Sequence, residues 1–419
     1  MTQAPALRRS LGLWRAFLSG VGVILGAGVY ALIAPPAGRA GGALWIAFLV
    51  AGVAAALTAY SYARLGRLRP RNSPEFQYTA LAFGPRAGFV AGWLMLAADL
   101  LAAATVALGF GGYLAHLAGT PVTANAVALL AALGLVVAVG IDQSVGLAVA
   151  LTFVEVLGLI AVILLGAPSW MSTNYLEAPH GIAGVWSAAS LIFFAYLGFD
   201  ELGNLAEEMR DPARDLPRAL WIAMGVTTTI YVLVALSATG AVGWRALADS
   251  PAPLARVAGA VLGERGAAGL AFVALAATAN TVLLLLVSAS RSVYGMAAAG
   301  VLPARLARIG ARQVPAEATW LVLVATGALL FVGGVAEVAT LTDAAVLLSF
   351  MLVNASLPWL AAHGRAPGRG WRRTADVLVP AAALVLCATL LAHAGWTALG
   401  VAVALAAVGL ALAPRRAAA

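Results

Sequence analysis

The chain has 419 residues, of which 63% are hydrophobic and only 10% are charged, and its mean hydropathy is +0.96. This composition excludes a water-soluble globular protein, because a soluble protein of this size carries many more charged residues at its surface. The formal net charge is +8 and every basic residue is an arginine. No soluble basic face with interleaved aromatic residues accompanies this charge, so we expect no nucleic-acid partner.

Long apolar segments follow one another along the whole chain. A transmembrane helix needs about 20 apolar residues to cross roughly 30 Å of hydrocarbon. By this criterion the sequence predicts an all-α integral membrane protein with 12 transmembrane helices, over residues 14–36, 42–64, 86–116, 123–141, 145–167, 184–208, 217–241, 267–298, 317–335, 339–361, 376–392 and 395–413.

The arginines indicate how these helices are oriented. If the N-terminus is cytoplasmic and the spans alternate in direction, most arginines lie inside or at the inner ends of spans. The exceptions, which would lie outside, are Arg39, Arg245, Arg256 and Arg265. The positive-inside rule therefore predicts a multi-pass protein of the cell inner (plasma) membrane with cytoplasmic N- and C-termini.

Residue types that catalytic and metal sites require are scarce. Cys387 is the single cysteine, and the four histidines lie far apart in the sequence. We find no nucleophile–base pair and no nucleotide-binding loop. The sequence therefore predicts no disulfide, no metal site, no cofactor and no enzymatic activity.

The first predicted span contains the glycine-rich stretch GVGVILGAGVY, over residues 20–30. Its spacing does not match the dinucleotide-binding pattern G-x-G-x-x-G. Gly22 and Gly26 match the G-x-x-x-G packing motif of membrane helices, which remains an alternative. A third interpretation is that the helix is interrupted at the Gly-Ala-Gly of residues 26–28, because each glycine weakens a helix by about 1 kcal/mol.

An interruption at this point would have a chemical use. It would leave carbonyl groups unpaired at residues 23–25 and N–H groups unpaired at residues 26–28. Such groups cannot stay unsatisfied in hydrocarbon, so they must line a cavity or bind a ligand. Carbonyls suit an ammonium group, and N–H groups at a helix N-terminus suit a carboxylate. The pattern therefore predicts a site for the α-amino and α-carboxylate groups of a free amino acid.

Two acidic residues lie in the middle of predicted spans, Asp99 in the third and Glu155 in the fifth. A charged carboxyl at that depth costs roughly 2.5–3.5 kcal/mol, so each is expected to be protonated, paired or facing water. Glu155 is the first candidate for proton coupling, and a structural hydrogen bond to a neighbouring helix is the alternative. Asp99 is expected either to line the substrate path or to pair with an arginine.

The sixth span offers a second interruption. In the segment SLIFFAYLGFDELGNLAEEMRDPARDLPRAL, which starts at Ser190, aromatic residues lead into Gly198, and Asp200 follows within the apolar run. Asp200 is interpreted as the N-cap of the second half of this helix or as a further coupling residue. The seventh span is expected to start with Asp215 as N-cap before Pro217. Two interrupted helices favour an inverted repeat of spans 1–5 and 6–10.

These stretches have a family resemblance. GVGVILGAGVY, and FFAYLGFD followed by LAEEMRDPARDLPRAL, resemble the first- and sixth-helix signatures of the amino acid–polyamine–organocation (APC) superfamily of permeases. The resemblance covers about residues 15–362 and implies a leucine-transporter-type fold, a 5+5 inverted repeat with helices 1 and 6 discontinuous. The expected parts of the chain are a cytoplasmic tail, a transport core of helices 1–10, helices 11–12 and a second cytoplasmic tail, over residues 1–13, 14–362, 363–413 and 414–419.

The resemblance also implies alternating access and an amino-acid-like substrate held between helices 1 and 6. Ala27 stands where many members have threonine or serine, so a hydroxyl donor to the substrate carboxylate is missing. Backbone groups of both helices, and an aromatic lid from the sixth, are implied to contact the substrate at Val23, Ile24, Gly26, Ala27, Gly28, Phe193, Phe194, Ala195 and Leu197.

We therefore expect a secondary active amino acid transporter. Proton-coupled uptake through Glu155, Asp99 or Asp200 is the first hypothesis, and exchange of amino acids or polyamines without proton coupling is the alternative. The expected partners are a small-molecule amino acid, a proton and the lipid bilayer. The sequence leaves the substrate side chain open between neutral and cationic amino acids or polyamines.

Overall fold

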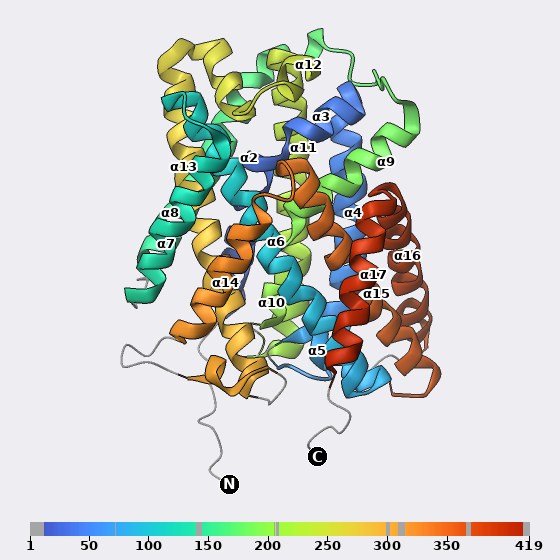
Figure 1. Ribbon diagram of the computed structural model, residues 1–419. Coiled ribbons are helices and arrows are strands. Elements are labelled where there is room, and N and C mark those ends of the chain that lie inside the picture. Colours follow the sequence, from blue (N-terminus) through green and yellow to red (C-terminus); the bar gives the residue numbers. More distant parts are fainter. Residues whose placement is uncertain are drawn as a thin grey trace.

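The computed structural model describes residues 12–71, 73–139, 145–204, 206, 209–298, 302–308, 315–365 and 370–413. Most of the two predicted tails, residues 1–11 and 414–419, lie outside these ranges. The elements assigned within the described residues are helices (Figure 1). In chain order they are α1 (Leu13–Ile24), α2 (Gly28–Leu32), α3 (Ala34–Ala40), η1 (Gly41–Ala43), α4 (Leu44–Leu65), α5 (Pro74–Phe83), α6 (Pro85–Ala118), α7 (Val122–Val139), α8 (Val145–Gly166), η2 (Ala167–Ser172), α9 (Gly181–Ile192), η3 (Phe193–Tyr196), α10 (Glu201–Asn204), α11 (Pro212–Val242), α12 (Trp244–Ala248), α13 (Pro253–Ala298), η5 (Ala304–Ala307), α14 (Ala316–Leu329), α15 (Val335–Ala362), α16 (Trp371–His393) and α17 (Trp396–Leu412).

Many of these helices are suited to a bilayer. Among the described residues, 8 helical segments are long and apolar enough to cross a membrane, and three further apolar helices, α7, α14 and α17, are shorter. Each predicted span overlaps one of these helices, or a group of shorter helices separated by turns. The chain is therefore a multi-pass membrane protein, as its composition predicted.

The helices pack along one another. α6 lies against α13 and α15, α4 lies against α11, and α16 packs on α15 and α4. In Figure 1, α3 and α12 lie at the upper end of the molecule, and α5 lies at the lower end. The connections at the two ends are thus separated by the length of the helices.

The first predicted span is interrupted. α1 ends at Ile24, residues 25–27 form a turn, and α2 begins at Gly28. The weak helix propensity of the two glycines accounts for the position of this turn. α2 is itself short, and a second change of direction at Ile33 leads into α3. The first span is therefore a series of short helices.

The sixth predicted span is also interrupted. α9 ends at Ile192 and continues as the 3₁₀ helix η3, after which Leu197 is extended. Gly198 has a φ of 111°, a backbone conformation that favours glycine. The chain becomes helical again at Glu201, where α10 begins.

The predicted start of the seventh span is wrong. α11 begins at Pro212 with Asp211 in the N-cap position, so Pro217 lies inside the helix. Pro212 supplies the same signal, a proline in the first helical turn, and it does so earlier in the chain. The helix therefore starts at the first of the two prolines.

Candidate functional site

The two interruptions lie against each other. A Cβ atom on Gly28, the first residue of α2, would lie 2.7 Å from the Cα atom of Ala195 in η3. This distance is too short for a real side chain, so α2 and η3 touch through their backbones and only glycine fits at this position. Two segments that are far apart in sequence thus form one region of irregular backbone.

A tyrosine from α11 bridges the two interruptions. The hydroxyl oxygen of Tyr231 lies 2.6 Å from the carbonyl oxygen of Ile24 and 2.9 Å from that of Ala195. Because a tyrosine has one O–H proton, it donates to only one of these carbonyls at a time. Ile24 is one of the residues predicted to bind a substrate amine, and its carbonyl oxygen has a second lone pair. Sequence reasoning missed Tyr231.

A threonine from α13 contacts the first interruption. The backbone N–H of Ala27 donates a hydrogen bond of 3.2 Å to Oγ1 of Thr281. Ala27 lies in the turn between α1 and α2, and its N–H is one of the groups predicted to bind a substrate carboxylate. The hydroxyl that Ala27 lacks is therefore present nearby, on another helix. Its place could not be predicted, because Thr281 lies within an ordinary apolar run.

The predicted residues of the sixth helix lie together at the same place. Phe193, Phe194 and Ala195 belong to η3 and are buried, and Leu197 follows half-buried. The ring of Phe193 packs edge-on against Phe350 of α15, with 6.1 Å between the ring centroids. η3 packs against α2, which follows the turn after α1. The side chain of Val23 is outside the part of the chain that is described.

Glu155 of α8 lies beside the first interruption. It is only 1% exposed, its side chain faces Asn280 of α13, and its Oε1 atom has no hydrogen-bond partner among the described residues. Tyr30 of α2 donates a hydrogen bond of 2.6 Å to the backbone carbonyl of Glu155. Asn280 directly precedes Thr281, so adjacent residues of α13 contact the Glu155 side chain and the Ala27 N–H.

Asp99 and Asp200 belong to a different set of acidic residues, which also includes Glu75 and Glu201 and which we call the acidic cluster. Asp200 directly precedes α10, and its carboxylate accepts a hydrogen bond of 3.0 Å from the N–H of Gly198. Asp99 of α6 lies within electrostatic range of Asp200, Glu201 and Glu75. The ion pairs of the described ranges do not include Asp99, so the expected pairing with an arginine is not observed there. The structure therefore places two of the predicted coupling residues together and Glu155 apart from them.

Glu75 of α5 is part of this acidic cluster. α5 lies in the connection between α4 and α6, outside the candidate spans. The hydroxyl of Tyr62 donates a hydrogen bond of 2.6 Å to Oε1 of Glu75. Burial, and then the nearby carboxyl of Asp200, raises the pKa of Glu75 from 4.5 to about 8. This environment was not predicted, because α5 lacks the long apolar run that marks a buried segment.

Comparison with known proteins identifies the family. The profile described as "Amino acid permease" matches residues 11–412, which is nearly the whole chain.

The chain belongs to the amino acid permease family.

Several relatives of this permease resemble it over most of their length. A branched-chain amino acid permease of Bacillus subtilis is 28% identical, over 93% of this chain and 89% of the relative. An uncharacterized transporter of Mycobacterium tuberculosis is 33% identical, over 92% of this chain and 86% of the relative. A vacuolar cationic amino acid transporter of Arabidopsis thaliana is 29% identical, over 80% of this chain and 60% of the relative. The family and these relatives are transporters, so the protein is a permease and not an enzyme.

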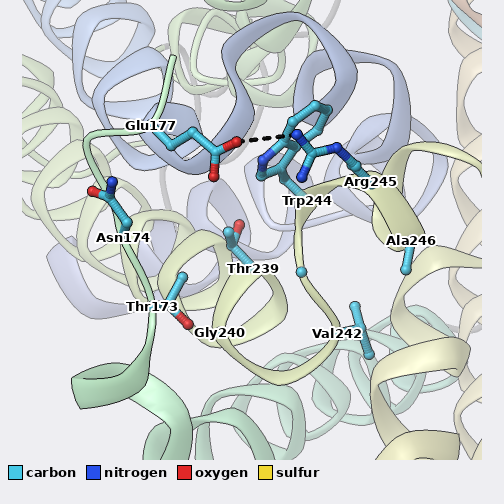
Figure 2. Close-up of a pocket in the computed structure, with 10 residues that line it drawn as sticks. Thr173, Asn174, Glu177, Thr239, Gly240, Val242, Trp244, Arg245 and Ala246 are labelled. Carbon is cyan, nitrogen blue, oxygen red and sulfur yellow. Dashed lines mark hydrogen bonds and ion pairs between the residues drawn. The ribbon is translucent and has the colours of Figure 1, made fainter. Parts of the chain in front are cut away.

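The permease also has a recess on its surface, away from the interruptions. A cavity of about 390 Å³ lies between the connection that precedes α9 and the segment that joins α11 to α12 (Figure 2). Arg245 and Glu177 form an ion pair of 3.3 Å at its edge, with side chains that are 73% and 40% exposed. Such exposed pairs contribute little to stability. None of the predicted site residues line this recess, so we place the candidate site at the two interruptions.

Proposed function

We propose that this permease is a secondary active transporter that takes up amino acids together with protons by alternating access. The supporting observation is that α2 and η3 touch at Gly28 and Ala195, and that Tyr231 bridges the carbonyls of both interruptions. Irregular backbone at membrane depth is tolerated where it lines a cavity or binds a ligand. The proposal includes a leucine-transporter-type fold of twelve spans with a 5+5 inverted repeat, and cytoplasmic termini in the cell inner membrane.

The backbone at the first interruption supports binding of an α-amino acid. The Ile24 carbonyl can accept from the substrate ammonium group, because a carbonyl oxygen accepts two hydrogen bonds. The Ala27 N–H, which donates to the neutral hydroxyl of Thr281, can donate to a substrate carboxylate instead. A hydrogen bond to a charged acceptor is roughly twice as strong as one between neutral groups, so this exchange of partners favours the substrate.

Glu155 is the proposed proton carrier. It is buried, one of its oxygen atoms lacks a partner in the described structure, and it faces Asn280. Because Asn280 and Thr281 are adjacent, a change in the hydrogen bonding of Glu155 can reach the Ala27 N–H through these two residues of α13. Asp99 and Asp200, which lie in the acidic cluster with Glu75, are the second candidates for the proton carrier.

The names of the relatives bear on the substrate. Two of them are named as amino acid transporters, one for branched-chain and the other for cationic substrates. We therefore propose an α-amino acid as the substrate of this permease.

Exchange and uptake measurements in proteoliposomes test this function. Vesicles containing the purified permease are loaded with unlabelled amino acids, and the entry of labelled amino acid is measured with and without an inward proton gradient. We expect exchange in both conditions and accumulation above the equilibrium level only with the gradient. Exchange that does not respond to the gradient would make the protein an exchanger, and the lack of any amino acid exchange would overturn the proposal.

A further inference from the structure

Asp343 of α15 is a buried acid that the mechanism above does not use. It is 0% exposed, and neither of its carboxylate oxygens has a hydrogen-bond partner among the described residues. The ion pairs in the described part of the chain do not include it either. Leaving a buried polar group unpaired costs about 1–3 kcal/mol, and more when the group is charged. Such groups are rare in native proteins, and each requires a physical explanation.

A second aspartate shows what a structural acid looks like in this permease. Asp376 of α16 is also 0% exposed. Its two carboxylate oxygens each accept a hydrogen bond of 2.6 Å from the guanidinium of Arg64, and Tyr60 donates a third hydrogen bond of 2.9 Å. Asp376 is therefore fully satisfied, whereas no described residue lies within hydrogen-bond geometry of Asp343.

The surroundings of Asp343 place it at the interruption of the sixth helix. Its carboxyl approaches the backbone of Phe194 in η3, and the guanidinium of Arg39 lies within electrostatic range. Neither contact meets the distance and angle of a hydrogen bond. Arg39 is already engaged, because it donates hydrogen bonds of 3.2 and 3.1 Å to the backbone carbonyl and hydroxyl of Ser187. It is also within range of a second acid, Glu337.

A bound proton does not remove the difficulty. A protonated carboxyl is a donor as well as an acceptor, so it needs an acceptor for its O–H. No described residue supplies one to Asp343. In either protonation state the carboxyl therefore lacks a partner, and a donor from outside the chain would satisfy it.

We infer that Asp343 binds the positively charged side-chain group of the substrate, which makes this a permease for cationic amino acids. The inference rests on the proposed function, because it assumes that an amino acid occupies the site between the interruptions. Phe194, beside which Asp343 lies, is one of the residues implied to contact the substrate. The backbone would hold the α-amino and α-carboxylate groups, and Asp343 would accept from the far end of the side chain.

The chemistry of the carboxyl favours an organic cation over a metal ion. An ammonium group has three N–H donors, and a guanidinium group can donate to both oxygens of one carboxylate. Hard metal ions take six or more oxygen ligands. The described residues contain no group of three or more histidine, cysteine, aspartate or glutamate side chains that could hold a metal.

Lysine and norleucine make a matched pair of substrates for the test, because norleucine has the same carbon chain without the terminal ammonium group. Proteoliposomes are loaded with each amino acid, and exchange against the labelled form is measured for the parent and for Asp343→Asn. We expect the parent to exchange lysine and arginine at concentrations at least tenfold lower than norleucine. We expect Asp343→Asn to lose about a hundredfold in apparent affinity for lysine, near the lower limit for removing one partner of a buried ion pair. Its preference for lysine over norleucine should disappear.

Two further variants keep the test interpretable. Glu337→Gln removes an exposed carboxyl from the same helix and should leave lysine exchange unchanged. Asp343→Ser provides a second way to remove the charge if Asp343→Asn is not stable. Both Asp343 variants should melt within a few degrees of the parent, because Asp343 has no described partner to lose.

The outcomes separate this inference from the proposed function. Exchange of norleucine or leucine without exchange of lysine would overturn the role of Asp343 and leave the transporter function in place. Equal lysine affinity in the parent and in Asp343→Asn would also overturn it. Norleucine exchange that requires sodium, and loses this requirement in Asp343→Asn, would assign the carboxyl to an inorganic cation instead. If the parent exchanges no amino acid at all, the proposed function itself fails.

Discussion

Two regions of this permease bury polar side chains, and the regions differ in whether those side chains have partners. Where α16 packs on α4, Asp376 is bound by Arg64 and Tyr60. In the same region Asn354 accepts a hydrogen bond from Ser61 and donates one to Thr58. Around the two interruptions, by contrast, the described residues supply no partner for an oxygen of Glu155, for the Oδ1 atom of Asn280 or for either carboxylate oxygen of Asp343.

We interpret this difference as one between the scaffold and the candidate site. A satisfied network in a membrane protein holds helices in one arrangement, since breaking it would leave unpaired groups away from water. Unsatisfied groups, by contrast, are where a ligand or a proton can be gained and lost without breaking a structural contact. The comparison therefore predicts that substitutions near α16 change stability, whereas substitutions near the interruptions change transport.

The largest effect on transport is expected at Gly28. Gly28→Leu should abolish exchange, because its Cβ atom alone would lie 2.7 Å from the Cα atom of Ala195 and would force α2 and η3 apart. Gly225→Leu is the matched control, since an added Cβ atom there meets no atom within 4 Å, and this variant should leave exchange intact. Membrane insertion of both variants is checked by yield and by size-exclusion chromatography. Undiminished exchange by an inserted Gly28→Leu protein would move the site elsewhere.

The largest effect on stability is expected at Asp376. Asp376→Asn should lower the free energy of unfolding by about 3–5 kcal/mol, because it leaves the buried Arg64 guanidinium without its charged partner. Asp343→Asn breaks no described hydrogen bond, so its stability should stay close to that of the parent. Thermal unfolding of the purified proteins in detergent measures both. The comparison between the two regions would be wrong if the two variants were destabilised equally.

Much of the architecture could be predicted from local sequence. The helices follow from apolar runs of sufficient length, and the first interruption from two glycines around Ala27. The second interruption could be predicted near Gly198, because glycine can adopt the positive φ that is found there. Glu155 stands out because it is an acid within an apolar run. These signals are local, so a single sequence carries them.

The rest depends on tertiary contacts between distant segments. Tyr231 reaches a carbonyl 207 residues away, and Thr281 accepts from an N–H 254 residues away. Asp343 and Asp376 are both acids within predicted spans, and nothing near them in sequence distinguishes a paired aspartate from an unpaired one. Their difference arises because Arg64 pairs with Asp376, whereas no described cation forms an ion pair with Asp343. Such contacts between distant residues cannot be predicted from hydrophobic periodicity or composition.

A third prediction tests whether the unpaired Glu155 carries the proton. Moving one proton down a potential of 100 mV releases about 2.3 kcal/mol, and at roughly 1.4 kcal/mol per tenfold change one coupled proton supports about fortyfold accumulation, beyond what the charge of the amino acid itself contributes. Glu155→Gln keeps the shape of the side chain but cannot release a proton. The variant should therefore still exchange substrate and lose gradient-driven accumulation.

Accumulation is measured in proteoliposomes with an imposed inward proton gradient, and exchange without a gradient is the internal control. If Glu155→Gln accumulates substrate as strongly as the parent, Glu155 is structural. The coupling would then have to be sought at Asp99 or Asp200.

The smallest expected effect concerns the pH dependence of stability, and it is expected at Glu75 of the acidic cluster. Glu75 is intermediate between the paired Asp376 and the unpaired Asp343, because Tyr62 donates a hydrogen bond to one of its oxygens. The pKa of Glu75 is raised from 4.5 to about 8 by burial and by Asp200. Between these two values the folded protein holds a proton that the unfolded chain has released. The stability contributed by neutral Glu75 therefore falls as the pH rises from about 4.5 and is lost above about 8. Glu75→Gln stays neutral throughout, so its melting temperature relative to that of the parent should rise between pH 5 and pH 8.5.

Glu317→Gln, which removes an exposed carboxyl, is the matched control, and its melting temperature should follow that of the parent. If the melting temperatures of Glu75→Gln and of the parent changed in parallel with pH, Glu75 would ionise without penalty, and the acidic cluster would then belong with the satisfied scaffold.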